Sequence, residues 1–348
     1  MSEDSKPQRR PRYKGTHPKS FREKYKEQNP EKYAEDVAKI IAQGKTPAGM
    51  HRSIMVDEIM EFLQIKPGQT GLDATLGYGG HSLRMLEALN GKGMLYATDV
   101  DPFELPRTTE RLLGFGYGEK IFQPRQMNFS ETDRIVQDSG PLNFVLADLG
   151  VSSMQIDNPD RGFSFKLEGP LDLRLNPHAG KPASAVLKKI GAPELADLFF
   201  EYSDETYADD IAEAIIHQGS KGQLIETTAQ LRGVIEAALE HLPKETRKEE
   251  IKKSCQRCFQ ALRIAVNHEF EVLEQFLEKL PDCLAPGGRV AVLTFHSGED
   301  RRVKKAFQYY FREGIFSEFS REPVRPSAGE CFSNPRAKSA KLRMGVKK

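Results

Sequence analysis

A glycine-rich turn with a carboxylate on either side is the first stretch of this chain whose residue types could do chemistry. The turn, Gly77-Tyr78-Gly79-Gly80, lets the backbone approach a ligand without clashes from Cβ atoms. Asp73 precedes the turn, and Asp99 follows about twenty residues later, where a carboxylate can bind the hydroxyls of a ribose. The spacing therefore predicts a site for a nucleoside cofactor.

Three features indicate which nucleoside cofactor to expect. The dinucleotide pattern G-x-G-x-x-G is broken, because Ser82 stands where the third glycine belongs, and no G-x-x-x-x-G-K-[ST] phosphate loop occurs. The acidic Asp73 at the turn suits a cationic amino and sulfonium group better than it suits a pyrophosphate. S-adenosylmethionine fits all three features. The alternative is an ordinary strand-to-helix turn with no ligand.

Alternating strands and helices must position these residues. The helix after the turn is indicated by a stripe of Leu83, Leu86 and Leu89. Short apolar segments predict strands at 72–75, 94–99, 121–124, 142–147, 290–295 and 340–343. We also expect helices at 54–63, 102–113 and 300–311. The pattern predicts an open α/β sheet.

Acidic residues follow three of the predicted strands. Asp73, Asp99 and Asp148 each fall at or near a carboxyl end, which is where open α/β sheets bind ligands. Three carboxylates at three strand ends indicate a site more strongly than any one of them. Phe129, after the third strand, could stack on an adenine, and packing against the sheet is the alternative.

The pattern changes from about residue 158. Helix-like segments at 193–202, 205–217 and 227–241 follow one another without a strand, and one long helix is expected at 258–280. A segment of roughly 100 residues is too long for a loop and predicts a helical insertion subdomain. Before the core, Asn29-Pro30 begins a predicted helix that runs to Gly44.

Charge is nearly balanced over the 348 residues, with a net charge of +1, but it is unevenly placed. Residues 1–48 carry 12 Lys and Arg against 7 Asp and Glu, and the last stretch, from Cys331 to Lys348, has six basic residues and no acidic one. These basic ends are compatible with phosphate contacts. Solvated tails are the alternative.

No apolar run approaches the roughly 18 residues that cross a membrane, and the N-terminus lacks the apolar core of a secretory signal. Four cysteines, Cys255, Cys258, Cys283 and Cys331, indicate a reducing compartment. The single C-x-x-C pair has no second pair, so a structural zinc is not expected. We therefore expect a cytoplasmic protein without a membrane segment.

Taken in order, these motifs resemble the bacterial 16S ribosomal RNA cytosine-N4 methyltransferase family, the MraW/RsmH group. The resemblance extends from about residue 50 to the C-terminus. The matching motifs are MVDE at 55–58, DATLGYGGHS at 73–82, DVDP at 99–102, DLGVSS at 148–153, RGFSF at 161–165, GPLDLR at 169–174, FQALRI at 259–264, FHS at 295–297 and NPRA at 334–337. Chance agreement of so many motifs in one order is negligible.

The resemblance implies a class I methyltransferase core, which is Rossmann-like with a doubly wound, mostly parallel sheet, and a helical insertion. It also implies S-adenosylmethionine as cofactor and, as target, a cytidine at the decoding centre of the small ribosomal subunit. Cofactor contacts are implied at Gly79, Gly80, His81, Asp99, Phe129, Asp148 and Gln155, to which the residues of the turn add Asp73 and Gly77.

We divide the chain into four parts on this basis. Residues 1–48 form a basic N-terminal extension that is expected to be partly disordered, chiefly at 1–19. Residues 49–157 form the first part of the methyltransferase core, and 258–348 form its second part with a basic tail. Residues 158–257 form the helical insertion, to which we assign substrate recognition.

The chain departs from the family pattern in three ways. Residues 1 to about 48 have no counterpart in the usual short family member. Tyr78 occupies a position that is often small or basic, and Gly298 replaces an apolar residue. Cys255 and Cys258 lie where relatives commonly carry other residues. We interpret the chain as a divergent member, for which another RNA or DNA cytosine is the alternative target.

Methylation of a cytosine amine makes particular demands. The amine is a poor nucleophile, so the site must align its nitrogen with the methyl group and accept a hydrogen bond from it. Asp148 or a nearby carbonyl is the candidate acceptor, and cofactor binding alone is its rival role. An Asn/Asp-Pro-Pro-aromatic signature is absent, and the lack of a Pro-Cys motif disfavours covalent C5 methylation.

The target base must be unpaired or flipped out to be reached. Arg161 and Arg174 could grip RNA around it, and salt bridges inside the insertion are the alternative. Asn267, His296 and Ser297 are further candidates for substrate contact. His81 and His296 are expected to form hydrogen bonds rather than bind a metal, because neither shows a second ligand at helical spacing.

Two other function classes are considered. A non-catalytic RNA- or ribosome-binding protein is disfavoured, because Asp73, Asp99 and the glycine turn are intact. A DNA cytosine-N4 methyltransferase would be expected to carry a basic recognition helix, whereas the insertion's helices are mixed in charge. A homodimer is left open.

Overall fold

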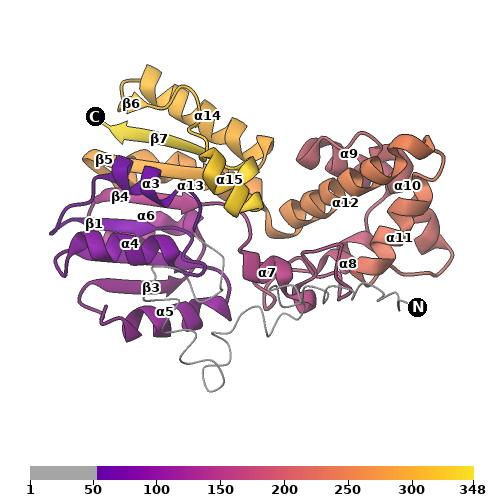
Figure 1. The fold of residues 1–348 in the computed structure, drawn as a ribbon, viewed down its shortest axis with the longest axis horizontal. Coiled ribbons are helices and arrows are strands. Elements are labelled where there is room, and N and C mark those ends of the chain that lie inside the picture. Colours follow the sequence, from indigo (N-terminus) through magenta and orange to yellow (C-terminus); the bar gives the residue numbers. More distant parts are fainter. Residues whose placement is uncertain (1–52) are drawn as a thin grey trace, which may run out of the picture. The chain divides into compact units, whose positions relative to one another are not determined.

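A computed structural model describes residues 53–348 (Figure 1). The predicted helix at 29–44 and the expected disorder at 1–19 lie outside the described residues. Within them, one seven-stranded sheet has the order β3-β2-β1-β4-β5-β7-β6. Its strands are β1 (Thr70–Asp73), β2 (Met94–Asp99), β3 (Phe122–Gln126), β4 (Leu142–Asp148), β5 (Leu284–Thr294), β6 (Phe316–Phe319) and β7 (Lys341–Lys347).

The sheet is mostly parallel, as predicted. Strands β1 to β5 pair in parallel, and β7 runs antiparallel between β5 and β6. The predicted doubly wound α/β fold is confirmed. β6 was not predicted, and β5 begins earlier than expected because the Pro-Gly-Gly segment before residue 290 already belongs to the strand.

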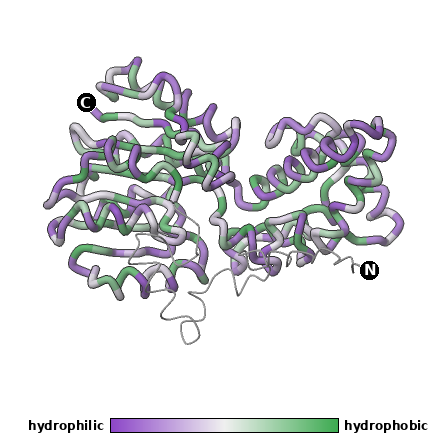
Figure 2. The backbone as a smooth tube through the Cα atoms, in the orientation of Figure 1, coloured by the Kyte–Doolittle hydropathy of each residue, from purple (hydrophilic) through white to green (hydrophobic). Residues whose placement is uncertain are grey.

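Helices cover both faces of the sheet because side chains alternate along each strand. In β4, Phe144 and Leu146 join one hydrophobic cluster, whereas Val145 and Ala147 join another. The helices that contribute buried residues to the first cluster are α3 (Val56–Leu63), α4 (Gly80–Leu89) and α5 (Glu104–Gly114). Those of the second are α6 (Thr132–Ser139), α13 (Glu269–Cys283) and α14 (Ser297–Arg312). Covered on both faces, β4 and the second half of β5 consist mostly of hydrophobic residues (Figure 2).

Further helices lie between β4 and β5 in the chain. They are α7 (Ser153–Asp157), the short 3₁₀ helix η3 (Pro159–Arg161), α8 (Ala183–Leu187), α9 (Ala192–Ser203), α10 (Ala208–Ser220), α11 (Thr228–Ala238) and α12 (Lys244–Asn267). We refer to α8 to α12 as the insertion helices. They share a separate hydrophobic cluster whose buried members fall between Leu171 and Leu262. The predicted cap of α11 is confirmed, because Thr227 Oγ accepts from the backbone N–H of Gln230.

The single helix predicted at 258–280 is wrong. The chain forms α12 and α13, which are separated at His268 by a left-handed backbone conformation with φ of 52°. The break lets α12 pack among the insertion helices while α13 packs against the sheet. The chain ends with α15 (Ala328–Ser333) and η4 (Pro335–Ser339) before β7.

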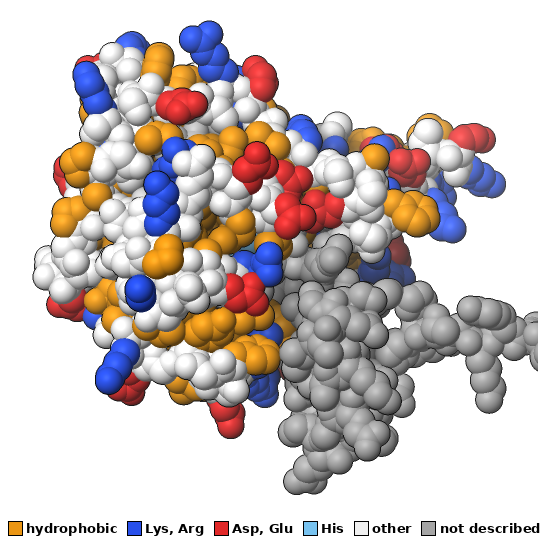
Figure 3. All heavy atoms as spheres, turned by 60° about the vertical axis from the view of Figure 1, so that its left-hand side comes forward, with side chains coloured by type: hydrophobic (Ala, Val, Ile, Leu, Met, Phe, Trp, Pro, Cys, Tyr) orange, Lys and Arg blue, Asp and Glu red, His pale blue; other side chains and the backbone are white. Residues whose placement is uncertain are grey.

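Two observations concern the surface of the described part. On the face seen in Figure 3, Lys and Arg side chains mostly stand apart from one another among side chains of other kinds. None of the helices within residues 53–348 combines the length and the apolar character that crossing a membrane requires.

Candidate active site

Three carboxylates gather at one edge of the sheet. Asp73, Asp99 and Asp148 are the last residues of β1, β2 and β4, which are neighbouring parallel strands. Carboxyl ends of parallel strands meet at the same edge, so the structure places these side chains together as the sequence predicts.

The glycine turn is held against the end of β2. The Asp99 carboxylate accepts hydrogen bonds from the backbone N–H groups of Gly77 at 2.8 Å and Asp101 at 2.9 Å. Gly77 and Gly79 have φ angles of 47° and 71°, which favour glycine. Helix α4 begins at Gly80, so the turn presents its backbone toward the strand ends.

Asp73 forms hydrogen bonds to residues on both sides of the glycine turn. Its carboxylate accepts a hydrogen bond from Ser82 Oγ at 2.6 Å and another from the backbone N–H of Thr75 at 3.1 Å. Burial raises the pKa of this carboxyl, and the bond from Ser82 opposes that rise. The structure thus gives Asp73 a positioning role, while its predicted contact with a cofactor stays a prediction.

Asp99 differs from Asp73 in being half-buried, whereas Asp73 is buried. Burial raises the pKa of its carboxyl to about 6, although the N–H groups of Asp101 and Gly77 act in the opposite direction. An ionised carboxylate offers about four lone-pair sites, of which these two N–H groups occupy two. Asp99 therefore keeps acceptor capacity for further hydroxyl donors.

His81 and Asp148 lie next to each other in the site. His81 is 5% exposed, and neither of its ring nitrogens has a hydrogen bond to another described residue. Its Nε2 lies 3.5 Å from Asp148 Oδ2. The Asp148 side chain is 28% exposed, and its backbone N–H donates to Thr75 Oγ1 at 2.7 Å, which fixes the end of β4. A buried imidazole without partners beside an accessible carboxylate indicates a place for a polar ligand.

Asp101 connects four segments of the site and was named at the sequence level only as part of a motif. It is fully buried, and its Oδ1 accepts from the backbone N–H groups of Phe103 and Glu104 at the start of α5. Its Oδ2 accepts from Gln155 Nε2 at 2.8 Å and from an Arg161 nitrogen at 2.7 Å. The signal that could have found it is the second acidic residue of DVDP, placed just before a helix that lacks any other cap.

Gln155 is engaged on both sides of its amide. Its Nε2 donates to Asp101, and its Oε1 accepts from the backbone N–H of Ser152 in a capping box at the start of α7. These bonds place Gln155 beside the predicted site without leaving it free to move. Its contact with the cofactor stays a prediction.

Phe129 lies at the first position of the 3₁₀ helix η2 (Phe129–Glu131). Its ring meets Phe276 edge to face, with centroids 5.3 Å apart. This contact supports the packing alternative, and because the side chain is only half-buried, stacking on an adenine also stays a prediction.

The residues expected to contact RNA are largely engaged within the protein. Arg161 is buried against Asp101 and also donates to the backbone carbonyls of Arg174 and Leu175. The Arg174 guanidinium donates twice to Asp172. The salt-bridge alternative is thus favoured for both arginines. The partner of Arg161, however, is Asp101, which belongs to the methyltransferase core and not to the insertion.

Asn267 has a similar structural role at the end of α12. Its side-chain oxygen accepts from the backbone N–H of Leu175, and its amide nitrogen donates to the carbonyls of Leu173 and Arg263. All of its polar atoms are therefore used to fix the loop that follows Arg161. The predicted contact of Asn267 with the substrate stays a prediction.

His296 and Ser297 lie where β5 leads into α14. Ser297 is exposed, with its Oγ 3.4 Å from Asp204 Oδ2 at the end of α9. His296 is more buried, and its Nε2 lies 3.1 Å from Glu299 Oε1. The expectation that His296 has no second ligand at helical spacing is therefore wrong, because Glu299 lies three residues later.

Glu269 joins this pair to form a three-residue cluster. One ligand atom from each of Glu269, His296 and Glu299 lies within 4.8 Å of the others. Arg263 donates to both oxygens of Glu269, at 2.7 and 2.8 Å. Despite burial, the contact with His296 holds the pKa of Glu299 below its usual value. The guanidinium supplies positive charge to the cluster, so we describe it as an ion-pair network.

A family model described as the MraW methylase family matches residues 48–348. The chain belongs to this family. It is accordingly an S-adenosylmethionine-dependent methyltransferase, as its sequence predicts, and S-adenosylmethionine is its cofactor. The orphaned imidazole of His81 and the acceptor capacity of Asp99 fit a cofactor that carries amino, carboxylate and ribose groups.

Curated relatives in the family match nearly the whole chain. "Ribosomal RNA small subunit methyltransferase H 2" of Alkaliphilus metalliredigens is 64% identical over 344 residues, which is 99% of each protein. "Ribosomal RNA small subunit methyltransferase H 1" of Lachnoclostridium phytofermentans is 59% identical over 97% of this chain and 93% of its own. A Cyanothece relative, 41% identical, covers 86% of this chain and 95% of its own. The N-terminal segment thus has a counterpart in the first two relatives.

Proposed function

We propose that this methyltransferase transfers the methyl group of S-adenosylmethionine to the exocyclic N4 of a cytidine in the RNA of the small ribosomal subunit, at the decoding centre. The observation that carries this proposal is the 64% identity, over nearly the full chain, to a relative named for small-subunit ribosomal RNA methylation. A ribosomal substrate also supports the expected cytoplasmic location.

The residues of the glycine turn and the strand ends would hold the cofactor. The backbone of Gly79 and Gly80 approaches it closely, the Asp99 carboxylate accepts from the ribose hydroxyls, and His81 donates to or accepts from the methionine portion. When bound, S-adenosylmethionine supplies an electrophilic methyl group.

Asp148 is our candidate for the group that accepts a hydrogen bond from the cytosine amine. The carboxylates of Asp73, Asp99 and Asp101 each accept at least two hydrogen bonds from the protein. The Asp148 carboxylate instead accepts no hydrogen bond from the described residues, and its ion-pair partner among them is His81, whose Nε2 lies 3.5 Å from Oδ2. An accessible carboxylate fixed at a strand end can orient the amine so that its nitrogen lone pair points at the methyl carbon.

Cofactor affinity should depend on pH through Asp99. Only the ionised carboxylate is a full acceptor for the ribose hydroxyls, and burial raises its pKa to about 6. We therefore expect the affinity for S-adenosylmethionine to be constant above pH 6 to 7 and to fall about tenfold per pH unit below 6. Isothermal titration calorimetry from pH 5 to 8 measures this dependence.

His81 also lies in the site, beside Asp148, so that experiment requires a control at this residue. A His81→Gln protein should keep the fall below pH 6, whereas Asp99→Asn should bind weakly at every pH. An affinity that stays flat from pH 8 to 5 would contradict the assigned role of Asp99.

Nucleoside analysis tests the proposed function directly. The wild-type protein is incubated with labelled S-adenosylmethionine and small ribosomal subunits that lack the native modification. We expect label in N4-methylcytidine and in no other nucleoside. Absence of transfer to any ribosomal particle, despite measurable cofactor binding, would overturn the assignment of ribosomal RNA as substrate.

A further inference from the structure

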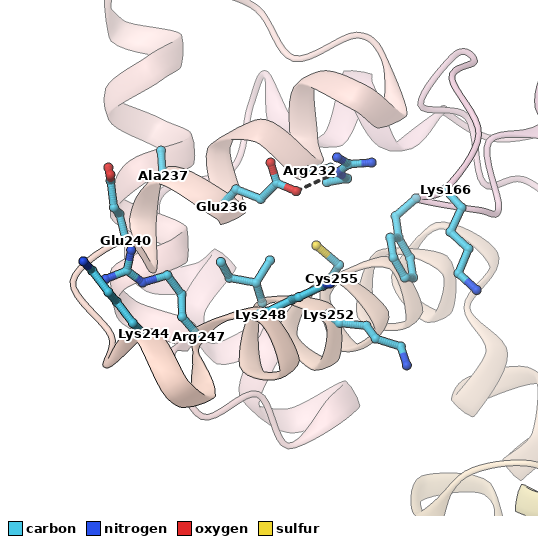
Figure 4. A pocket seen from close by; sticks show the side chains of 12 residues that line it. Lys166, Arg232, Glu236, Ala237, Glu240, Lys244, Arg247, Lys248, Lys252 and Cys255 are labelled. Atoms are coloured by element: carbon cyan, nitrogen blue, oxygen red, sulfur yellow. Dashed lines mark hydrogen bonds and ion pairs between the residues drawn. The ribbon is translucent and has the colours of Figure 1, made fainter.

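An open pocket of about 710 Å³ lies between α11 and α12, among the insertion helices (Figure 4). We call it the basic pocket, because six of the twelve residues that line it are cationic. They are Lys166, Arg232, Lys244, Arg247, Lys248 and Lys252. Glu236 and Glu240 are the carboxylates of the lining, which leaves an excess of four positive charges.

Three lysines form a stripe along α12. Lys244, Lys248 and Lys252 are spaced four residues apart, and all three are exposed. Within residues 53–348 none of them has an ion pair with a carboxylate. Like charges four residues apart repel one another on a helix, so a polyanion that neutralises the stripe would relieve this repulsion.

The rest of α12 shows that the stripe is not a general feature of this helix. Lys253, the next residue after the stripe, lies within 3.4 Å of Glu249 and within 3.0 Å of Glu250. The helix therefore separates its charges, with ion pairs on one side and unpaired lysines lining the basic pocket. Such a separation suits a partner that brings its own negative charge.

The two arginines of the basic pocket are oriented by the protein. Arg232 on α11 donates to Glu236 at 2.8 Å. Arg247 on α12 donates through Nε and Nη2 to the backbone carbonyl of Leu242. These bonds hold both guanidinium groups at the wall of the pocket, where each has further N–H donors.

Part of the lining of the basic pocket is apolar. Phe165, Ile251 and Cys255 contribute to it, and the Phe165 ring packs edge to face on Phe259 with centroids 6.0 Å apart. Burial raises the pKa of Cys255 to about 12, so this thiol stays neutral and adds no reactive group. A pocket lined by an aromatic ring and by cationic side chains can hold a nucleobase and its flanking phosphates together.

We propose that the basic pocket binds the phosphodiester backbone of the substrate RNA. This inference rests on the proposed function and names the part of the protein that holds the RNA away from the reacting base. It replaces Arg161 and Arg174 in that role, because their guanidinium groups are paired inside the protein.

The salt dependence of RNA binding tests this proposal. The probe is a fluorescein-labelled single-stranded RNA of the small-subunit sequence around the proposed target, titrated with protein at several salt concentrations. The test variant is K244Q/K248Q/K252Q. Removing three phosphate contacts from a single strand should lower the slope of log K against log salt by about 2, which corresponds to roughly 100-fold weaker binding at 0.1 M salt.

A matched triple variant controls for the change in net charge. Lys92, Lys120 and Lys305 are exposed lysines outside the insertion helices, so K92Q/K120Q/K305Q carries the same charge change. We expect it to bind RNA within about threefold of wild type, and we expect both triple variants to bind S-adenosylmethionine normally. Circular dichroism and thermal unfolding check that both variants fold.

Two results would overturn the role of the basic pocket. One is a pocket variant whose affinity and salt slope equal those of the control, and the other is a wild-type protein that does not bind the RNA at all. The proposed function fails separately. The wild-type protein could bind RNA through these lysines and yet form no N4-methylcytidine in small subunits. That result would support the role of the basic pocket and overturn the proposed function.

Discussion

Replacing Asp101 by alanine is expected to lower the free energy of unfolding by about 3–5 kcal/mol. The substitution leaves the Arg161 guanidinium buried without its carboxylate, and removing one partner of a buried ion pair typically costs this much. It also removes the acceptor for the N–H groups at the start of α5. Urea denaturation at pH 7 measures the change.

Two further variants make this prediction sharper. Asp160 is exposed one residue before Arg161, and Asp160→Ala should change the stability by no more than about 0.5 kcal/mol. Adding Arg161→Met to Asp101→Ala should recover part of the loss, because no uncompensated charge then remains. A loss below 1 kcal/mol for Asp101→Ala would show that the pair contributes little.

Replacing Asp148 by alanine is expected to lower the rate of methyl transfer at least 100-fold, while the dissociation constant for S-adenosylmethionine changes less than threefold. A positioned group that hydrogen bonds to the reacting atom typically contributes 100- to 10,000-fold. The contacts that we propose for the cofactor at Asp99 and the glycine turn do not involve Asp148, so the substitution leaves them in place. Single-turnover transfer and calorimetric binding measure the two quantities separately.

The rival role of Asp148 predicts the opposite pattern. If this side chain only binds the cofactor, Asp148→Ala should weaken S-adenosylmethionine binding while the rate at saturating cofactor stays close to wild type. Asp148→Asn keeps the shape and one acceptor oxygen, so its rate should fall between those of wild type and alanine. Asp160→Asn, which changes charge alone outside the site, serves as the control.

Much of the fold could be predicted from the sequence, because several buried strands contain short apolar runs and three of them, β1, β2 and β4, end at an Asp residue. β6 could not, since in this four-residue strand Ser317 and Glu318 are exposed and no apolar run marks it. The break between α12 and α13 was missed for another reason. Helical periodicity continues through His268, and neither Gly nor Pro marks the left-handed conformation of this residue, at which α12 ends.

The positions of the candidate site residues could be predicted, but the role of each carboxylate could not. Asp73, Asp99 and Asp148 could be identified because they follow predicted strands. Which carboxylates are engaged depends on partners far away in the chain, such as Arg161 for Asp101. The basic pocket was missed because the lysines of α12 alternate in sequence with glutamates, and only the turn of the helix places them on separate sides.

The connection between β4 and β5 has a consequence for how the chain reaches its native state. These neighbouring parallel strands pair Phe144 with Arg289, so more than a hundred residues must be spanned before the centre of the sheet can close. Loop-closure entropy grows with the length of a flexible connection and slows such non-local pairing. The insertion helices, whose own cluster uses contacts between Leu171 and Leu262, can assemble first and shorten the effective connection. Their early collapse would then set the rate at which the two halves of the sheet join.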